Sequence, residues 1–208
     1  MIRETFPVGL LQCNCTILGD EQSHEAIVVD PGYEVPRILA ALAKHQLTVK
    51  QIVVTHAHID HIASAVELKA ITGAPILYNR ADLPLTEMME QQAGWIGVKT
   101  PEVRPPDHSP ADLETVSVRG VEAQVIHTPG HTEGSLCLLV PAASLLLAGD
   151  TLFAGSVGRT DLPGGHHGKL IESIRERLLP LPDATLVVPG HGPETTIGEE
   201  RVSNPFLV

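Results

Sequence analysis

The chain has 208 residues, of which 43% are hydrophobic and only 3% aromatic, so one domain with an aliphatic core is expected. No apolar run approaches the roughly 20 residues that a membrane-spanning helix needs. The formal net charge is −11 with 14 Lys and Arg residues, a poor electrostatic match for nucleic acid. Small anionic substrates are still compatible with this charge, because bound divalent cations would offset some of it locally.

The expected location of the chain is the cytoplasm. Residues 1–7 contain an acid and a proline where a secretory signal would need an apolar stretch. Cys13 and Cys15 are separated by one residue, so they share a strand face without forming a strain-free bridge. These two and Cys137 are expected to be small buried hydrophobic groups in a reducing compartment.

The first part of the chain alternates strand-like and helix-like segments. Ile38, Leu39 and Leu42 recur at helical spacing, whereas the β-branched segment 51–55 is typical of a buried strand. Strands are expected over 10–18, 26–30, 51–55 and 74–78, and helices over 35–46 and 60–72. This order predicts an α/β fold with layered elements.

Four potential metal ligands, His56, His58, Asp60 and His61, directly follow the strand at 51–55. In α/β proteins the carboxyl ends of strands are where sites are built. His56, His58 and Asp60 would point to one side of an extended backbone, and His61 breaks this alternation. Asp60 and His61 could serve a second position beside the first. The spacing therefore predicts two adjacent metals.

The segment 80–112 interrupts the layered pattern. It includes a predicted helix over 82–92 with Met88 and Met89, then Trp95 and a proline-rich loop. A long irregular insertion in a compact domain is often a functional lid, which here would present Met and Trp to a substrate. The alternative is a surface excursion that the same residues hold down by packing.

The last part of the chain returns to strands and delivers three more candidate ligands at turns. Strands are expected over 113–125, 136–140 and 145–148 and before His191, with a helix over 168–179. His131 and His191 each follow a Pro-Gly pair, and Asp150 follows a glycine that allows a tight turn. His and carboxylate ligands without Cys indicate zinc, iron or manganese in a catalytic site.

The ordered set His-x-His-x-Asp-His, Pro-Gly-His-Thr, Gly-Asp-Thr and a late Pro-Gly-His resembles the metallo-β-lactamase-fold hydrolases. The resemblance runs from about Gln12 to Phe206. It is strongest for the short, glyoxalase II-like group, through segments 149–153, 158–165 and 190–196. It implies a four-layer αβ/βα sandwich over 1–208, with metals in the cleft between the sheet edges. The C-terminal helical domain of the larger glyoxalase II enzymes is not expected here.

The resemblance also implies the role of each ligand and two divalent metal ions, with zinc expected first and iron or manganese as alternatives. The first metal would be held by His56, His58 and His131, the second by Asp60, His61 and His191, with Asp150 bridging the two. A water between the ions would lose a proton near neutral pH and attack the substrate. Asp60 would also act in catalysis by orienting this nucleophile.

Arg159 is the candidate substrate-binding residue. It lies nine residues after Asp150 in a loop that begins with Gly158. The larger glyoxalase II enzymes carry a basic residue at the matching place, which contacts glutathione, and an aromatic residue close behind it. Here Asp161 stands in the place of that aromatic residue, so an internal ion pair between Arg159 and Asp161 is the alternative.

The function that the resemblance favours is hydrolysis of a small thioester, such as S-D-lactoylglutathione or a related acyl thioester. The thiolate is a good leaving group, so no strong general acid is needed. A persulfide dioxygenase of the same fold, with one iron at the first position, is the alternative enzyme. A non-enzymatic metal-binding protein is a third hypothesis, which the complete ligand set disfavours.

Overall fold

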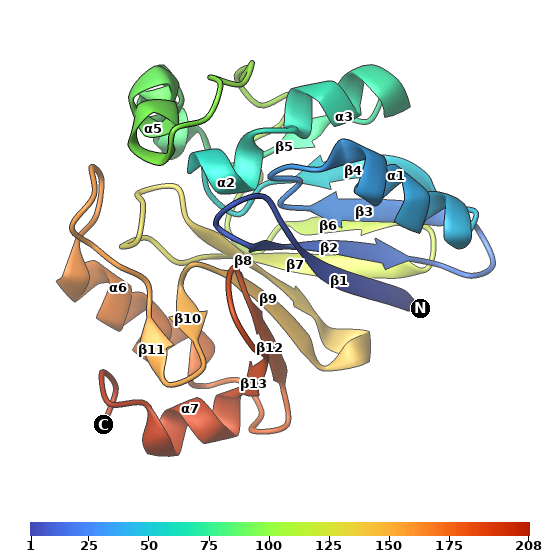
Figure 1. Ribbon diagram of the computed structural model, residues 1–208. Helices are drawn as coiled ribbons and strands as arrows, with labels where there is room; N and C mark the ends of the chain where they lie inside the picture. Colours follow the sequence, from blue (N-terminus) through green and yellow to red (C-terminus); the bar gives the residue numbers. More distant parts are fainter.

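The computed structural model describes residues 1–208 and contains two β-sheets stacked between outer helices (Figure 1). The N-terminal sheet has the order β1-β2-β3-β4-β5. Its first three strands are antiparallel, and β3, β4 and β5 are parallel. The strands are β1 (Ile2–Val8), β2 (Cys13–Gly19), β3 (Glu25–Val29), β4 (Thr48–Val53) and β5 (Ile76–Leu77).

The C-terminal sheet has the order β13-β12-β9-β8-β7-β6. Only β12 and β9 pair in parallel; the other neighbours are antiparallel. The strands are β6 (Thr115–Val118), β7 (Val121–His127), β8 (Leu136–Val140), β9 (Leu145–Gly149), β12 (Leu186–Pro189) and β13 (Thr195–Thr196). A separate hairpin is formed by β10 (Leu152–Phe153) and β11 (Ser156–Val157).

Helices cover the outer face of each sheet, as Figure 1 shows. The N-terminal half carries α1 (Val35–Lys44), α2 (Ile59–Ile62), α3 (Ala65–Thr72), α4 (Leu83–Glu87) and α5 (Met89–Ile96), and the short 3₁₀ turn η1 (Arg80–Asp82). The C-terminal half carries the 3₁₀ turn η2 (Pro141–Ala143), α6 (His167–Ser173), the π-helical turn η3 (Ile174–Leu178) and α7 (Ile197–Ser203). None of these helices has the length and apolar character that crossing a membrane requires.

The period-two alternation of strand residues creates the layers. In β3, Ala26 and Val28 pack toward the outer helices, whereas Ile27 and Val29 pack into the core shared by the two sheets. On the other side, Cys137 and Leu146 pack against α6 and α7 in a third cluster. Because the sheets share one core, the chain forms a single domain, and the predicted four-layer sandwich is confirmed.

The expected elements are present, but several boundaries were wrong. The strand predicted over 10–18 begins at Cys13, because Gly9 and Gln12 have positive φ and the chain turns there from β1, which was not predicted. The helix predicted over 60–72 divides between Ile62 and Ala65. The helix predicted over 82–92 is likewise divided into α4 and α5. The three cysteines are free and buried, as predicted.

Candidate metal centre

Four loops meet where strands of the two sheets end, and each loop brings predicted ligands. The loop after β4 carries two histidines and continues into α2, which carries two more candidates; the others follow β7, β9 and β12. The seven residues that gather are His56, His58, Asp60, His61, His131, Asp150 and His191. All the predicted ligand positions therefore lie in one place.

The alternation inferred for this loop holds only in part. His58 is extended, with φ −73° and ψ 148°, but Asp60 and His61 lie on the first turn of α2. A helical turn separates neighbouring side chains by about 100°. Asp60 and His61 consequently face a second group of donors because they are helical, which agrees with the helix predicted from residue 60.

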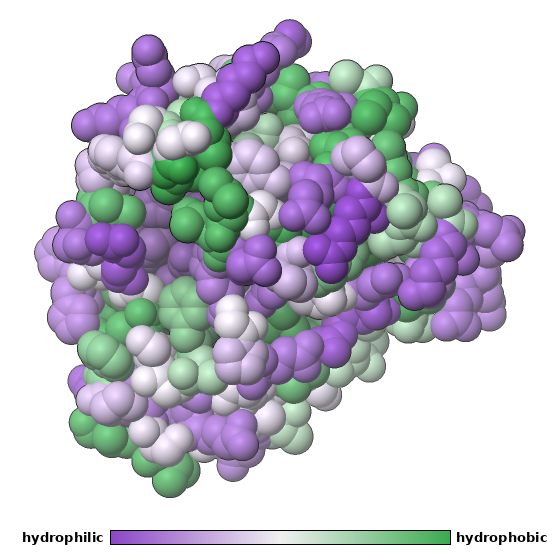
Figure 2. Space-filling view, in the orientation of Figure 1, coloured by the Kyte–Doolittle hydropathy of each residue, from purple (hydrophilic) through white to green (hydrophobic).

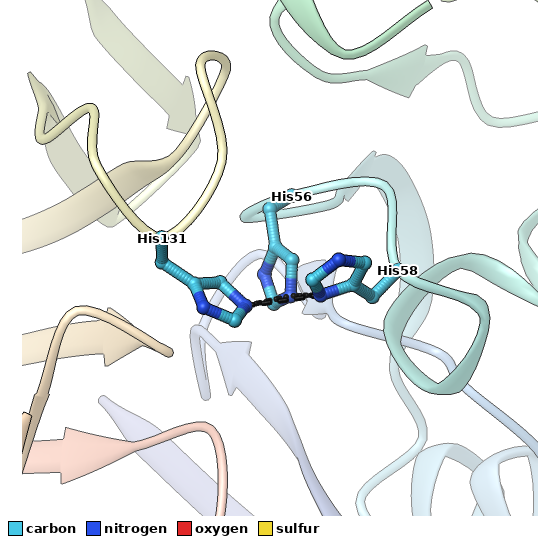
Figure 3. Close-up of side chains that lie close together, drawn as sticks. All are labelled: His56, His58 and His131. Carbon is cyan, nitrogen blue, oxygen red and sulfur yellow. Dashed lines mark hydrogen bonds between the residues drawn. The ribbon is translucent and has the colours of Figure 1, made fainter. Parts of the chain in front are cut away.

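Three imidazoles form the first group of donors (Figure 3). The Nε2 atom of His131 lies 3.1 Å from His56 Nε2 and 3.0 Å from His58 Nδ1, and the last two are 3.1 Å apart. Three nitrogens bound tetrahedrally to one ion at 2.0–2.1 Å would be separated by roughly 3.3 Å. The triangle is therefore about the size that one metal ion needs.

The partners of the other ring nitrogens indicate which protonation states these histidines have. His131 Nδ1 donates to the Arg159 carbonyl at 2.7 Å. His56 Nδ1 lies 3.2 Å from Thr55 Oγ1, whose own hydrogen goes to Asp30. Each of these two rings therefore carries its hydrogen on Nδ1, and both Nε2 atoms keep a lone pair. Two lone pairs facing each other at 3.1 Å repel, so this geometry fits a cation between them.

The electrostatics of the first group agree with this protonation. Burial lowers the pKa of His56 well below its usual range, and neighbouring imidazoles add to the effect. Burial likewise lowers the pKa of His58 to about 3, with His131 contributing. Both rings are therefore neutral near pH 7, as ligation of a metal requires.

The second group of donors combines imidazoles with carboxylates. His191 Nε2 lies 3.3 Å from His61 Nε2 and 3.0 Å from Asp60 Oδ2. The Nδ1 atoms of the two rings are engaged elsewhere, that of His191 with the Leu11 carbonyl at 2.9 Å and that of His61 with the Asp30 carboxylate at 2.9 Å. The Nε2 atoms of both rings therefore face the same space.

Asp150 links the two groups. Its Oδ1 lies 3.4 Å from His61 Nε2, and its Oδ2 lies 3.7 Å from both His131 Nε2 and His191 Nε2. Oδ1 is buried and has no hydrogen-bond partner. A buried carboxylate oxygen without a partner is costly, and a bound cation would satisfy it. The donor set thus fits two adjacent metal ions.

Negative charge is concentrated at the second group. Burial acts to lower the pKa of His61, but the surrounding anionic groups, which include Asp30, Asp60 and Asp150, raise it above its usual value. The pKa of His191 is also raised: burial opposes the shift, and Asp60 and Asp150 cause it. These carboxylates therefore favour a positive charge at this position, which a metal ion would supply.

Gly190 is required for the position of Asp150. A Cβ atom at residue 190 would collide with Asp150 Oδ1 and lie 2.8 Å from His61 Cε1. The backbone of Gly190 also accepts a hydrogen bond from Asn14 and donates one to Gly149. The glycine before His191 consequently brings β12 against both carboxylate and imidazole, which no larger residue would allow.

Asp30 supports the centre, although sequence reasoning gave it only the role of a strand end. Besides holding His61, its carboxylate accepts hydrogen bonds from the Thr55 amide at 2.7 Å and the Thr55 hydroxyl at 2.8 Å. Cys13 Sγ lies 3.5 Å from the same His61 nitrogen, and burial raises the pKa of this thiol to about 12. The strand predicted over 26–30 gave no sign of this contact.

Asp82 is a second supporting residue that sequence reasoning missed. It is 1% exposed and accepts hydrogen bonds from Ala57 N at 2.9 Å, Thr132 Oγ1 at 2.9 Å and Gly134 N at 2.7 Å. One carboxylate therefore joins the loop of His56 and His58 to the loop of His131. No motif marks it, because its partners are mainly backbone amides.

A cavity of about 570 Å³ opens in front of the donors. Arg159 lines it and also forms a bidentate pair with Asp161, with distances of 2.7 and 2.8 Å. Both of these side chains are mostly exposed. Arg159 thus lies at the cavity, as a substrate-binding role requires, and also forms the alternative ion pair with Asp161. The cavity is lined by Leu11, His58, Ile59, Asp60, Gln92, Trp95, Ile96, His131, Asp150, Arg159, Leu162 and His191.

The insertion 80–112 forms one wall of this cavity through α5. Gln92 is buried; its Oε1 accepts a hydrogen bond from Ile59 N at 2.9 Å, and its Nε2 donates to the Leu85 carbonyl. Met89 packs into the core, whereas Trp95 faces the cavity. The insertion therefore both packs down and presents a tryptophan to the site; its movement as a lid stays a prediction.

The comparison with known families decides the affiliation of the chain. The model of the metallo-beta-lactamase superfamily matches residues 8–191, which include all seven donor residues. The chain belongs to this superfamily. Hydroxyacylglutathione hydrolase GloC of Haemophilus influenzae is 37% identical to it over 206 residues, which cover 98% of the chain and 97% of that relative. This likeness supports the glyoxalase II-like group within the superfamily.

Solved structures of other proteins share the fold of this superfamily member along its whole length. The BLEG-1 B3 metallo-beta-lactamase has a TM-score of 0.92 and 34% identity, with 99% of both chains covered. TTHA1623 in a di-iron-bound form has a TM-score of 0.88 and 36% identity, with both chains fully covered. ETHE1 from Myxococcus xanthus has a TM-score of 0.82 and 28% identity, covering 99% of this chain and 84% of that one.

Proposed function

We propose that this protein is a metal-dependent hydrolase of small thioesters. The observation that carries the proposal is the pair of adjacent donor groups that share the Asp150 carboxylate. The 37% identity with the H. influenzae hydroxyacylglutathione hydrolase supports a thioester as the substrate class. A glutathione-derived thioester such as S-D-lactoylglutathione is the first substrate to test.

In this proposal the two donor groups hold two divalent ions. His56, His58 and His131 bind the first, and Asp60, His61 and His191 bind the second, with Asp150 between them. When bound, the ions would activate a water molecule as nucleophile and polarise the thioester carbonyl. Zinc suits this ligand set, and iron is the metal in the similar TTHA1623 structure.

The protein side chains would orient the reaction. Asp60 lines the cavity with its Oδ2 near His191, so it can accept a hydrogen bond from the attacking water and set its direction. The departing thiolate needs no strong acid, which agrees with a cavity in which every lining His and Asp is a candidate metal ligand. Arg159 would contact an anionic part of the substrate, away from the reacting carbonyl.

A persulfide dioxygenase is the second candidate, because ETHE1 from M. xanthus has the same fold at 28% identity. That reaction needs one iron at the first position. The complete second donor group, with Asp60, His61 and His191 all in place, favours the hydrolase.

The deciding experiment measures metal content, thiol release and oxygen uptake on one preparation. S-D-lactoylglutathione, other acyl thioesters and glutathione persulfide are offered with and without oxygen. The hydrolase releases thiol at the same rate without oxygen and contains two metals. Consumption of oxygen with the persulfide, and no cleavage of any thioester, would contradict the proposal and assign the dioxygenase.

A further inference from the structure

One wall of the cavity is apolar although it faces the metal donors. Leu11, Ile59, Trp95 and Ile96 line this wall. Trp95 is 51% exposed and Leu11 is 46% exposed, although most large hydrophobic side chains of the protein are buried. Scattered exposed hydrophobic residues are ordinary, but here they converge on one cavity. Figure 2 shows hydrophobic side chains gathered around the place that α5 occupies in Figure 1.

The helix α5 contributes Trp95 and Ile96 to this wall from one of its faces. Gln92, Trp95 and Ile96 stand at i, i+3 and i+4, so their side chains lie on the same side of the helix. Gln92 fixes that side toward the site, since its amide oxygen holds Ile59 N between the candidate ligands His58 and Asp60. The tryptophan is therefore held at the cavity by a buried hydrogen bond.

The opposite edge of the wall is fixed just as directly. Leu11 lies in the turn between β1 and β2, and its carbonyl accepts the hydrogen bond from His191 Nδ1 at 2.9 Å. The backbone of Leu11 thus orients a candidate metal ligand while its side chain lines the cavity. Both edges of the wall are tied to the ligands, so an apolar group placed there would lie beside the reacting atoms.

The charged residues of the cavity also favour an apolar substrate group. Arg159 is the single Lys or Arg among the lining side chains, and Asp161 already compensates its charge. The cavity thus offers little to a substrate recognised mainly through several anionic groups. Its largest uncommitted feature is hydrophobic surface, including the flat face of an indole, which suits alkyl and aryl groups.

We propose that Leu11, Ile59, Trp95 and Ile96 bind an apolar alkyl or aryl group of the thioester substrate, and that Trp95 determines specificity for it. This inference rests on the proposed thioester hydrolase. It predicts that affinity and turnover increase with the length of an unbranched alkyl chain until the wall is covered. Each added methylene should change the dissociation constant by about fourfold.

The single tryptophan of the chain makes this binding measurable without turnover. Uncleavable S-alkyl thioethers of N-acetylcysteamine, from methyl to octyl, carry no charge and differ only in chain length. Titration of the metal-loaded protein should change the Trp95 fluorescence, and the dissociation constant should fall with each methylene. An unchanged emission together with a dissociation constant that ignores chain length would overturn the inference.

Three variants separate specificity from folding. By calorimetric titration, Trp95→Ala should lose most of the dependence on chain length, and Trp95→Phe should recover it. Ile71→Ala removes an equally exposed hydrophobic side chain on α3, outside the cavity, and should behave as wild type. A Trp95→Ala variant that keeps the full dependence on chain length would remove Trp95 from the substrate site.

Turnover of the matching S-acyl thioesters keeps the two proposals distinct. Thioester cleavage at a rate that ignores acyl length would contradict the apolar wall and leave the hydrolase standing. Binding that follows chain length, with no cleavage of any thioester, would contradict the hydrolase and leave the wall as a binding site. Both effects together support both proposals.

Discussion

Asp150 is the side chain that faces both groups of donors. Oδ1 is directed toward His61, and Oδ2 toward His131 and His191. An outer histidine belongs to one group only. Removal of the Asp150 carboxylate should therefore reduce binding of both metal ions, whereas removal of an outer histidine should reduce binding of one.

Asp150→Ala should lower the metal content from about two ions per chain to fewer than one, whereas His191→Ala should retain about one. Elemental analysis after gentle purification measures this, with His167→Ala, an exposed histidine on α6, as the control. Equal losses in Asp150→Ala and His191→Ala would contradict the shared role of Asp150.

Arg159→Ala should raise KM for an anionic thioester by about tenfold and leave kcat nearly unchanged, because a remote contact acts equally in the ground and transition states. Its pair with Asp161 is exposed, so the melting temperature should fall by less than about 4 °C. KM and melting temperature are measured on the same preparation.

A neutral thioester and Asp161→Asn provide the controls for Arg159. KM for the neutral substrate should not change in Arg159→Ala. Asp161→Asn frees the guanidinium and should lower KM for the anionic substrate. If Arg159→Ala loses stability while KM for the anionic substrate stays constant, Arg159 is a structural ion-pair partner only.

At the scale of elements, the loops of the first donor group are held together from outside. Asp82, at the end of η1, accepts hydrogen bonds from both loops. Burial raises the pKa of Asp82, and the three donors act against that shift. The distance between these loops thus depends on one carboxylate of the insertion 80–112.

Asp82→Ala should destabilise the protein by roughly 3–5 kcal/mol, because it leaves three buried donors without a partner. It should also weaken metal binding on the order of tenfold to hundredfold. Chelator competition well below the melting temperature measures the second effect. Asp82→Asn should be intermediate in both, and Glu90→Ala on the exposed face of α5 should have no effect. Unaltered metal affinity in folded Asp82→Ala would contradict the link.

The elements that were predicted correctly carry a strong local hydrophobic pattern, either a helical period or a continuous buried run. The helix at 35–46 corresponds to α1, whose buried Ile38 and Leu42 recur at helical spacing. The strand at 51–55 overlaps β4, whose neighbouring Ile52 and Val53 are buried on opposite faces of the sheet. The helix predicted over 60–72 breaks because Ser64 N donates to the Pro31 carbonyl, a contact between distant segments. The local hydrophobic pattern cannot predict such contacts between distant segments.

In the site, too, residues that belong to a local sequence pattern were predictable, and residues that act through contacts between distant segments were not. The seven donors were predictable because His and Asp recur at strand ends in a recognisable order. Asp30, Asp82 and Gln92 were not, because each acts on backbone or ring N–H groups that any sequence offers. Their roles depend on which segments the fold brings together, and this is decided by the packing of the two sheets.

At the scale of the whole molecule, the centre joins the two halves of the sandwich. The N-terminal half contributes His56, His58, Asp60 and His61, and the C-terminal half contributes the other donors. Beneath them lies the core that the sheets share, which contains no polar ligand. Metal binding and sheet packing therefore stabilise the same interface by different means.

Removal of the metals by a chelator should lower the melting temperature by about 10 °C, and the protein should stay folded at 25 °C. A ligand at 1,000 times its dissociation constant contributes about 4 kcal/mol, whereas the shared core is unaffected. Far-UV circular dichroism and thermal scans before and after chelation measure both effects. Unfolding on chelation at 25 °C would show that the shared core alone does not keep the protein folded, and would contradict the prediction.

The triangle of His56, His58 and His131 spans both halves of the chain, with its outermost members 75 positions apart in the sequence. Two nitrogens from one half are too few for a tetrahedral ion, so the complete triangle exists only after the sheets have docked. Capture of an ion is then a late event during refolding. During refolding in the presence of cobalt, the appearance of visible absorption would therefore report the time at which the two sheets dock.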